Sequence, residues 1–120
     1  MLYFSPKIKV DYSPIQGRGV FATDSIKKNE VIEECHFVKL AESDFIKLDN
    51  SVKEISFAWP LFTNNSHAIV LGFGSIYNHN DDNNATWETD TEKMCYRFIA
   101  VKDIEAGQEI CTNYMKVTSF

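Results

Sequence analysis

Two stretches of this chain share one pattern: FATDSIKKNEVI at residues 21–32 and IAVKDIEAGQEI at residues 99–110. They align without a gap, and their apolar residues flank a polar turn at matching positions. Asn29 and Gly107 match within the turns, and both residue types adopt a positive φ at low cost. The repeat predicts two similar strand-turn-strand units in a duplicated β core, since two units are too few for a solenoid. A chance likeness of two ordinary β units is the alternative.

The remainder of the chain continues the β pattern. Short runs rich in Val, Ile, Phe and Tyr alternate with Gly, Asn, Asp and Pro, which is typical of strands separated by turns. The predicted strands cover residues 7–11, 20–23, 30–39, 55–59, 67–71, 85–89, 94–101 and 109–113. Only residues 42–53, with Phe45, Leu48 and Val52 at helical spacing, predict a short helix. The predicted fold class is therefore mainly β.

Length and composition set the domain count and the broad class. A chain of 120 residues with 44% hydrophobic residues can bury one core and has no room for two. No apolar run approaches the roughly 20 residues of a membrane span, and the first residues lack a signal-peptide pattern. We therefore expect a single soluble domain that is not exported.

Charge and cysteine content exclude several function classes. The 12 Lys and Arg residues are scattered against 17 Asp and Glu, a net charge of −5, which argues against a nucleic-acid surface. Cys35, Cys95 and Cys111 are odd in number and lack a CxxC spacing, so neither a disulfide framework nor a zinc site is indicated. Reduced, mostly buried thiols in a reducing compartment are expected.

The first candidate functional cluster is the glycine turn GRGVFA at residues 17–22. Gly17 and Gly19 flank Arg18 in a turn where backbone can approach a ligand without a Cβ in the way. A phosphate-binding loop does not fit, because the turn leads into a strand and no helix N-terminus follows. A plain tight turn is the alternative.

The second cluster is LGFGSIYNHNDDNNA at residues 71–85. It reads as the end of an apolar strand, a turn that contains two glycines, and a very polar loop. His79, Asp81 and Asp82 are residue types that bind metals, but no second histidine or spaced cysteine completes a ligand set. We therefore predict no metal here. An Asx-rich loop without a site explains the same residues.

The third cluster is DIEAGQEICTNY at residues 103–114, a turn and a strand that ends on Tyr114. Taken alone, a tyrosine that closes a strand is usually a packing residue. Its order after the two glycine-containing clusters changes the interpretation.

In that order, the Gly-x-Gly-Val-Phe-Ala turn, the Asn-His turn and the Gly-x-Glu-x-x-x-x-Tyr ending resemble the SET-domain lysine methyltransferases. The resemblance spans residues 13–114, and the motif spacing is similar to that of minimal stand-alone SET proteins of viruses and bacteria. It implies a SET-domain (β-clip) fold of small sheets with a C-terminal pseudoknot. It also implies one SET domain over residues 1–120, without a pre-SET or zinc-binding post-SET segment.

The resemblance implies transfer of a methyl group from S-adenosylmethionine to a lysine in an extended segment of a protein, with a homodimer as in the viral forms. A viral origin would place the protein in the host cytoplasm or nucleus. The residues implied for catalysis are Tyr114 and Tyr77; for the cofactor, Gly17, Arg18, Gly19, Asn78, His79, Tyr114 and Phe120; and for the lysine channel, Ile55, Tyr77 and Thr112.

Departures from the family pattern at Ile55 and in the tail leave an alternative open. Ile55 stands where small SET proteins carry a tyrosine, so one channel wall would lack a hydroxyl unless Tyr77 or Tyr96 supplies one. Thr112 replaces an aromatic residue and suggests room for more than one methyl group, and the tail after Tyr114 is short. A degenerate SET domain that binds a protein partner without catalysis is the competing hypothesis.

Overall fold

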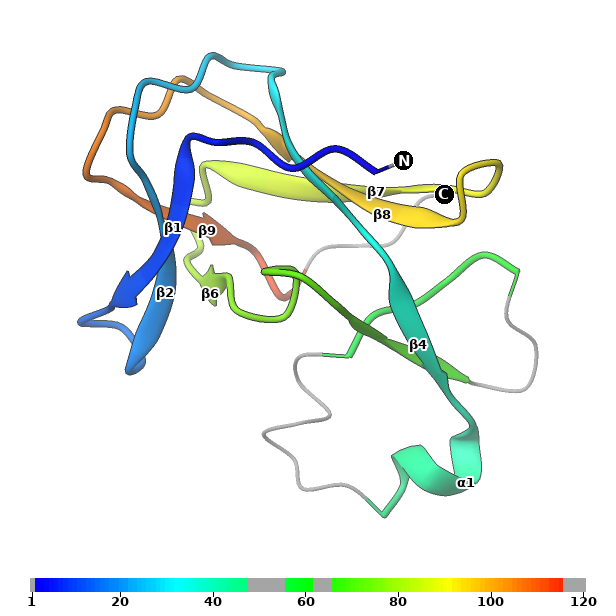
Figure 1. The fold of residues 1–120 in the computed structure, drawn as a ribbon. Coiled ribbons are helices and arrows are strands. Elements are labelled where there is room, and N and C mark those ends of the chain that lie inside the picture. The colour runs from blue at the N-terminus through cyan, green and yellow to red at the C-terminus, as the bar shows by residue number, and fades with distance from the viewer. Residues whose placement is uncertain (1, 48–55, 62–65, 116–120) are drawn as a thin grey trace.

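Three small sheets contain nearly all of the regular structure in the computed structural model, which describes residues 2–47, 56–61 and 66–115 (Figure 1). The first sheet has the order β1-β2-β9-β6, the second β3-β8-β7, and the third pairs β4 with β5. The strands are β1 (Ile8–Tyr12), β2 (Arg18–Ala22), β3 (Val31–Cys35), β4 (Phe37–Leu40), β5 (His67–Val70), β6 (Asn78–His79), β7 (Ala85–Asp90), β8 (Cys95–Ala100) and β9 (Glu109–Thr112). The described helix is α1 (Glu42–Phe45).

The two sequence repeats pair with one another around an approximate two-fold axis. Ile26 and Ile104 exchange both backbone hydrogen bonds, each with an N–O distance of 2.8 Å. The N–H groups of Asn29 and Gly107 each donate to the alanine carbonyl near the start of the opposite repeat, also at 2.8 Å. Their φ angles are 72° and 90°, as the turn positions predict. The prediction of two similar strand-turn-strand units in one β core is confirmed.

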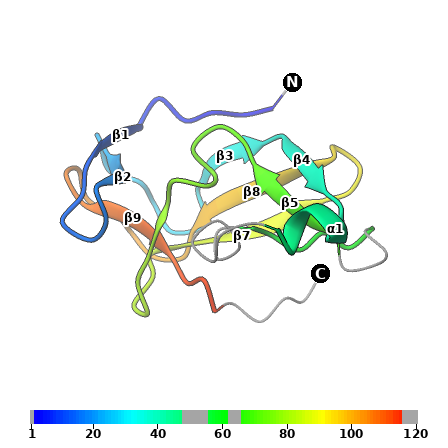
Figure 2. The ribbon, with the colours of Figure 1, turned by 90° about the horizontal axis from the view of Figure 1, so that it is seen from below.

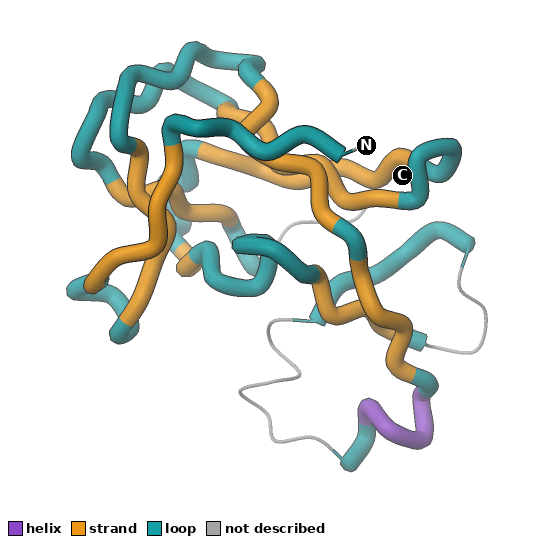
Figure 3. The backbone as a smooth tube through the Cα atoms, viewed as in Figure 1, coloured by secondary structure: helices purple, strands orange, loops and turns teal. Residues whose placement is uncertain are grey.

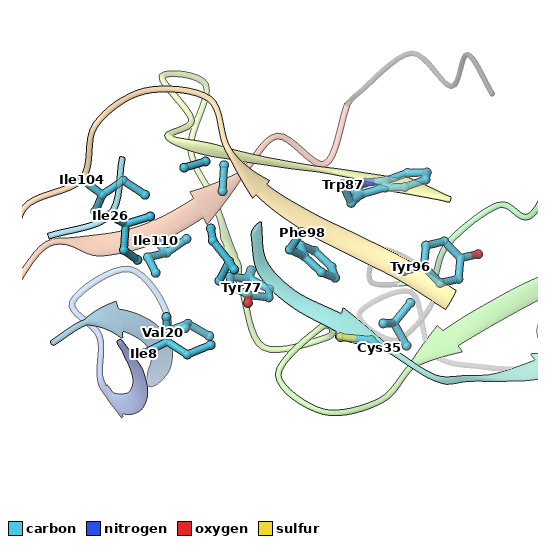
Figure 4. Packing of buried hydrophobic residues seen from close by; sticks show 14 of the residues in the cluster. Ile8, Val20, Ile26, Cys35, Tyr77, Trp87, Tyr96, Phe98, Ile104 and Ile110 are labelled. Atoms are coloured by element: carbon cyan, nitrogen blue, oxygen red, sulfur yellow. The ribbon is translucent and has the colours of Figure 1, made fainter. Parts of the chain in front are cut away.

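One apolar core runs between the first two sheets (Figure 4). Val20, Ile110 and Phe98 come from β2, β9 and β8, and all three are fully buried. Because strand side chains alternate between faces, β2, β7 and β8 each supply every second residue to this core. Burying each such side chain contributes about 1.5–3 kcal/mol to folding, so the core joins the repeated units into a single body.

The last strand, β9, is enclosed by earlier parts of the chain. It lies between β2, which is antiparallel to it, and β6, which is parallel to it. The Asn84 side chain bonds its backbone twice, donating to the Glu109 carbonyl and accepting the Cys111 N–H, both at 2.8 Å. Figure 2 shows β9 beside β1 and β2 at one end of the molecule. This is the predicted SET-type arrangement, in which the C-terminal segment threads past an earlier loop.

The prediction of one strand over residues 30–39 was wrong in one respect. This stretch forms two strands, β3 and β4, which are separated at His36 (Figure 3). The two halves serve different sheets: β3 pairs with β8, whereas β4 pairs with β5. A single straight strand cannot reach both partners. The two-residue strand β6 was not predicted, since its polar residues carry no alternating pattern.

The predicted helix at residues 42–53 is shorter within the described part of the chain. It ends at Phe45 and is followed by a turn, while residues 48–53 lie outside the described residues. The predicted strand at 55–59 is reduced to one bridge, between Phe57 and Ala68. Ile55 also lies outside the described residues.

The cysteine prediction holds: Cys35, Cys95 and Cys111 are all buried free thiols. Within the described segments, no helix has the length and apolar character needed to cross a membrane.

The two related turns provide a matched stability test. We expect Gly107→Ala to lower the free energy of unfolding by about 1–2 kcal/mol, because a Cβ opposes a positive φ although the space around it is open. Asn29→Gly should not destabilise the protein, because it relieves the same constraint in the other turn. Urea unfolding of both variants checks this, and equal effects would contradict it.

Candidate functional site

The Glu109 carboxylate joins the three sequence clusters. Its Oε1 accepts a hydrogen bond from the Ser13 hydroxyl at 2.6 Å, and its Oε2 accepts one from the Asn78 amide at 2.8 Å. Asn78 also donates to the Arg18 carbonyl at 2.8 Å. Ser13 and Asn78 are 4% and 6% exposed and Glu109 is half-buried, so these partly buried bonds hold the first turn, the middle turn and the last strand together.

The two glycines of the first turn are required for different reasons. A Cβ on Gly19 would lie 2.3 Å from Glu109 Oε2 and 3.0 Å from Asn78 Nδ2, so a side chain would break the central contact. Gly17 has a φ of 53°, and nothing lies within 4 Å of its Cβ position. The backbone at Gly17 is therefore open to a ligand, while Gly19 makes room for the protein's own side chains.

Tyr114 is held at both its backbone and its hydroxyl. Its N–H donates to His79 Nδ1 at 2.8 Å, and its hydroxyl donates to the Tyr77 carbonyl at 2.6 Å. Because His79 Nδ1 accepts, the neutral ring carries its proton on Nε2, which contacts Asp81 Oδ1 at 2.8 Å. Tyr114 is 39% exposed, and its hydroxyl bond to Tyr77 is partly buried.

Tyr77 meets Tyr114 through its carbonyl, while its own side chain points into the core. The ring is 2% exposed and stacks on Phe98 with centroids 4.6 Å apart (Figure 4). Its hydroxyl donates to Glu33 at 2.6 Å, and burial raises the pKa of Tyr77 well above its ordinary value. The side chain of Thr112 is likewise enclosed, at 4% exposed.

Two residues expected at the site, Ile55 and Phe120, lie outside the described residues. The chain next to Ile55 is anchored by Tyr96, whose hydroxyl donates to the Ala58 carbonyl. The Tyr96 ring also packs against Trp59, with centroids 5.1 Å apart. The Tyr96 hydroxyl is therefore already engaged in holding this stretch.

The metal alternative lacks a ligand set in the described part of the chain. Asp82 forms an ion pair with Lys102 at 2.7 Å, which leaves His79 and Asp81 as the pair in contact. No group of three His, Cys, Asp or Glu side chains suited to a metal ion occurs among the described residues.

Sequence reasoning missed four residues that organise the site. Ser13, Asn84 and Glu109 connect segments distant in the chain, and Glu33 receives the Tyr77 hydroxyl. Glu109 lies inside the Gly-x-Glu motif, and Glu33 is one of two glutamates in β3, directly after two apolar residues. Both signals are visible in the sequence, but neither says which partner the side chain meets.

Comparison with known proteins agrees with this geometry. The SET domain family matches residues 17–115. A Schizosaccharomyces pombe protein, histone-lysine N-methyltransferase, H3 lysine-37 specific, is 24% identical over 117 residues, which cover 90% of this chain and 78% of that protein.

Solved structures share the fold. A candidate histone methyltransferase of Plasmodium falciparum superposes with a TM-score of 0.72 at 26% identity, over 92% of this chain and 95% of that one. A humanized mutant of the Chaetomium thermophilum Polycomb Repressive Complex 2, bound to an inhibitor, gives a TM-score of 0.71 at 20% identity, over 90% of this chain and 15% of that chain.

The small sheets, the enclosed last strand and the joined Asn-His and tyrosine motifs define a SET-type fold. The match over residues 17–115 covers most of the chain, and the chain belongs to the SET domain family. The resemblance inferred from the three ordered motifs is confirmed.

The Glu109 contact can be tested directly. We expect Glu109→Gln to lower the free energy of unfolding by about 1–2 kcal/mol, because an amide NH2 would replace one of two accepting oxygens. Rotating the Ser13 hydroxyl gives little relief, since its oxygen already accepts the Ile15 N–H at 3.1 Å. Urea unfolding is the measurement. Glu105→Gln, at an exposed position, is the control, and an equal loss there would contradict the assignment.

Proposed function

We propose that this chain is an active protein-lysine N-methyltransferase that transfers a methyl group from S-adenosylmethionine to a lysine of a protein. The observation that carries this proposal is the Tyr114 hydroxyl, which is bound to the Tyr77 carbonyl at 2.6 Å beside the Asn-His turn. The family match and the S. pombe relative support the reaction class. A ctPRC2 structure of the same fold, with a TM-score of 0.72 at 21% identity, is bound to S-adenosylmethionine.

The residues present fit this cofactor. Gly17 offers backbone with open space at its Cβ position, next to the turn that contains Asn78 and His79. The rings of His79 and Tyr114 lie 5.2 Å apart, and both are partly exposed. We assign cofactor binding to Gly17, Arg18, Gly19, Asn78, His79 and Tyr114. When bound, the cofactor supplies an electrophilic methyl group on a sulfonium.

The protein's part in the reaction is positioning and desolvation. A free lysine with a pKa near 10.4 is about 0.1% neutral near pH 7.4, so the amine must lose its proton before it attacks. An apolar channel disfavours the ammonium form, and no dedicated base is then required. The Tyr114 hydroxyl donates its proton to the Tyr77 carbonyl, so its oxygen is held in a fixed position, where it could accept a weak C–H···O contact from a methyl group.

Methyl transfer and its dependence on Tyr114 form the central test. Purified protein should transfer label from S-adenosylmethionine to a lysine of a protein in a cell extract, located by mass spectrometry. Tyr114→Phe should lower the rate at least about tenfold, because the hydroxyl that orients the reactants is lost. Tyr3→Phe, at a surface tyrosine 45% exposed, is the matched control and should retain the rate.

The degenerate-domain alternative is favoured by Ile55, the departure in the expected lysine channel. Calorimetry with S-adenosylmethionine separates the hypotheses. Binding together with transfer supports the enzyme. Absence of binding in the wild-type protein, or binding without transfer on any protein of the extract, would support a partner-binding module instead.

The pH dependence provides a further test. Because only the neutral amine attacks, the transfer rate at low peptide concentration should rise by up to about tenfold per pH unit below the substrate lysine's pKa. The slope should remain in Tyr3→Phe. A rate that is flat between pH 7 and 9 would indicate that a step other than attack by the amine limits the reaction.

A further inference from the structure

Glu33 is a buried carboxyl in an otherwise largely apolar core. The residue is 1% exposed, and its Oε1 accepts the Tyr77 hydroxyl at 2.6 Å. Oε2 faces the turn that begins the same segment: the Phe73 N–H points at it from 3.4 Å, and a Cβ on Gly72 would lie 3.0 Å away. Glu33 therefore contacts both ends of the segment from residue 72 to residue 77.

Packing alone does not account for a carboxyl at this position. Burial raises the pKa of Glu33, with hydrogen bonds from Tyr77 and Cys35 opposing that rise. No lysine or arginine pairs with it among the described residues. A leucine of similar size would avoid the desolvation cost, so the carboxyl points to a requirement beyond filling the core.

The segment held by Glu33 ends at the carbonyl that receives Tyr114. The Tyr77 ring is fixed on one face by Phe98, with ring planes 22° apart, and at its tip by Glu33. Beyond the carbonyl, Asn78 is paired with β9 through Cys111. The Tyr77 peptide group is thus held by the tyrosine side chain on one side and by the parallel strand pair on the other.

We propose that Glu33 is a positioning residue that acts through Tyr77. By anchoring the buried Tyr77 hydroxyl, Glu33 orients the Tyr77 carbonyl, and this carbonyl in turn orients the Tyr114 hydroxyl. The direction of the Tyr114 hydroxyl at the proposed cofactor site is thereby fixed. This assignment rests on the proposed methyl transfer for its catalytic consequence, but the geometric coupling stands without it.

A paired variant separates positioning from folding. Glu33→Leu combined with Tyr77→Phe removes the carboxyl and the hydroxyl together. Of their partners among the described residues, only the Cys35 thiol and the Phe73 N–H, 3.4 Å from Oε2, lose an acceptor. The paired variant should therefore be more stable to heat than Glu33→Leu alone, which leaves the buried hydroxyl unpaired. The proposal expects kcat to fall about tenfold while KM for S-adenosylmethionine changes less than about twofold. When the same two substitutions are added to Tyr114→Phe, kcat should fall no further. Wild-type kcat in the paired variant, or additive losses in both backgrounds, would overturn the proposal.

The control variant, Ser5→Ala, removes a buried hydroxyl that lies in the same region but, within the described part of the chain, makes no hydrogen bond to Tyr77 or Tyr114. Ser5 is 1% exposed, its N–H donates to the Ile32 carbonyl at 3.0 Å beside Glu33, and its hydroxyl accepts the Lys7 N–H. Ser5→Ala should lower stability while kcat is retained. An equal fall of kcat in Ser5→Ala would show that loss of core stability explains the effect.

A spectroscopic readout needs no methyl transfer. With tyrosine labelled at 13Cζ, the Tyr114 signal, assigned by its loss in Tyr114→Phe, should shift in the paired variant toward that of Tyr12, which is 85% exposed. An unchanged signal would overturn the coupling. Were the wild-type protein to transfer no methyl group, the proposed function would fail, and this measurement would still decide whether Glu33 orients Tyr114.

Discussion

The carboxylate of Glu109 ties together the three segments on which the site depends. Ser13 and Asn78 both donate to it, so the turn after β1 and the strand β6 are held against the last strand. Both bonds are accepted by a carboxylate, and together they close loops of many residues. Gly19 belongs to the same contact, because a side chain there would occupy the space of the carboxylate.

The duplicated frame explains how that contact can form. The two repeats meet through the Ile26–Ile104 pair, which places the strands on either side of each turn in different sheets. β9 then lies between β2 and β6, and the parallel pairing with β6 brings His79 beside Thr112. Tyr114, two residues further on, consequently meets the Asn-His turn.

Much of this arrangement could be predicted from the residues. The repeat predicted the duplicated β core, and three motifs in order predicted the family and the proximity of Asn78, His79 and Tyr114. What could not be predicted is the use of each side chain. Tyr77 shows why: its sequence position implied a hydroxyl at the site, whereas the backbone carbonyl faces Tyr114 and the hydroxyl meets Glu33.

Some residues of this chain are required by the local backbone conformation, and others by contacts with distant strands. The sequence by itself determined the turns at Asn29 and Gly107, because a positive φ is a property of one residue and its neighbours. Only the tertiary structure decided the roles of Gly19 and Glu33. Their constraints come from side chains on strands that are distant in the chain, and such contacts exist only after β9 and the segment before β6 have taken their places.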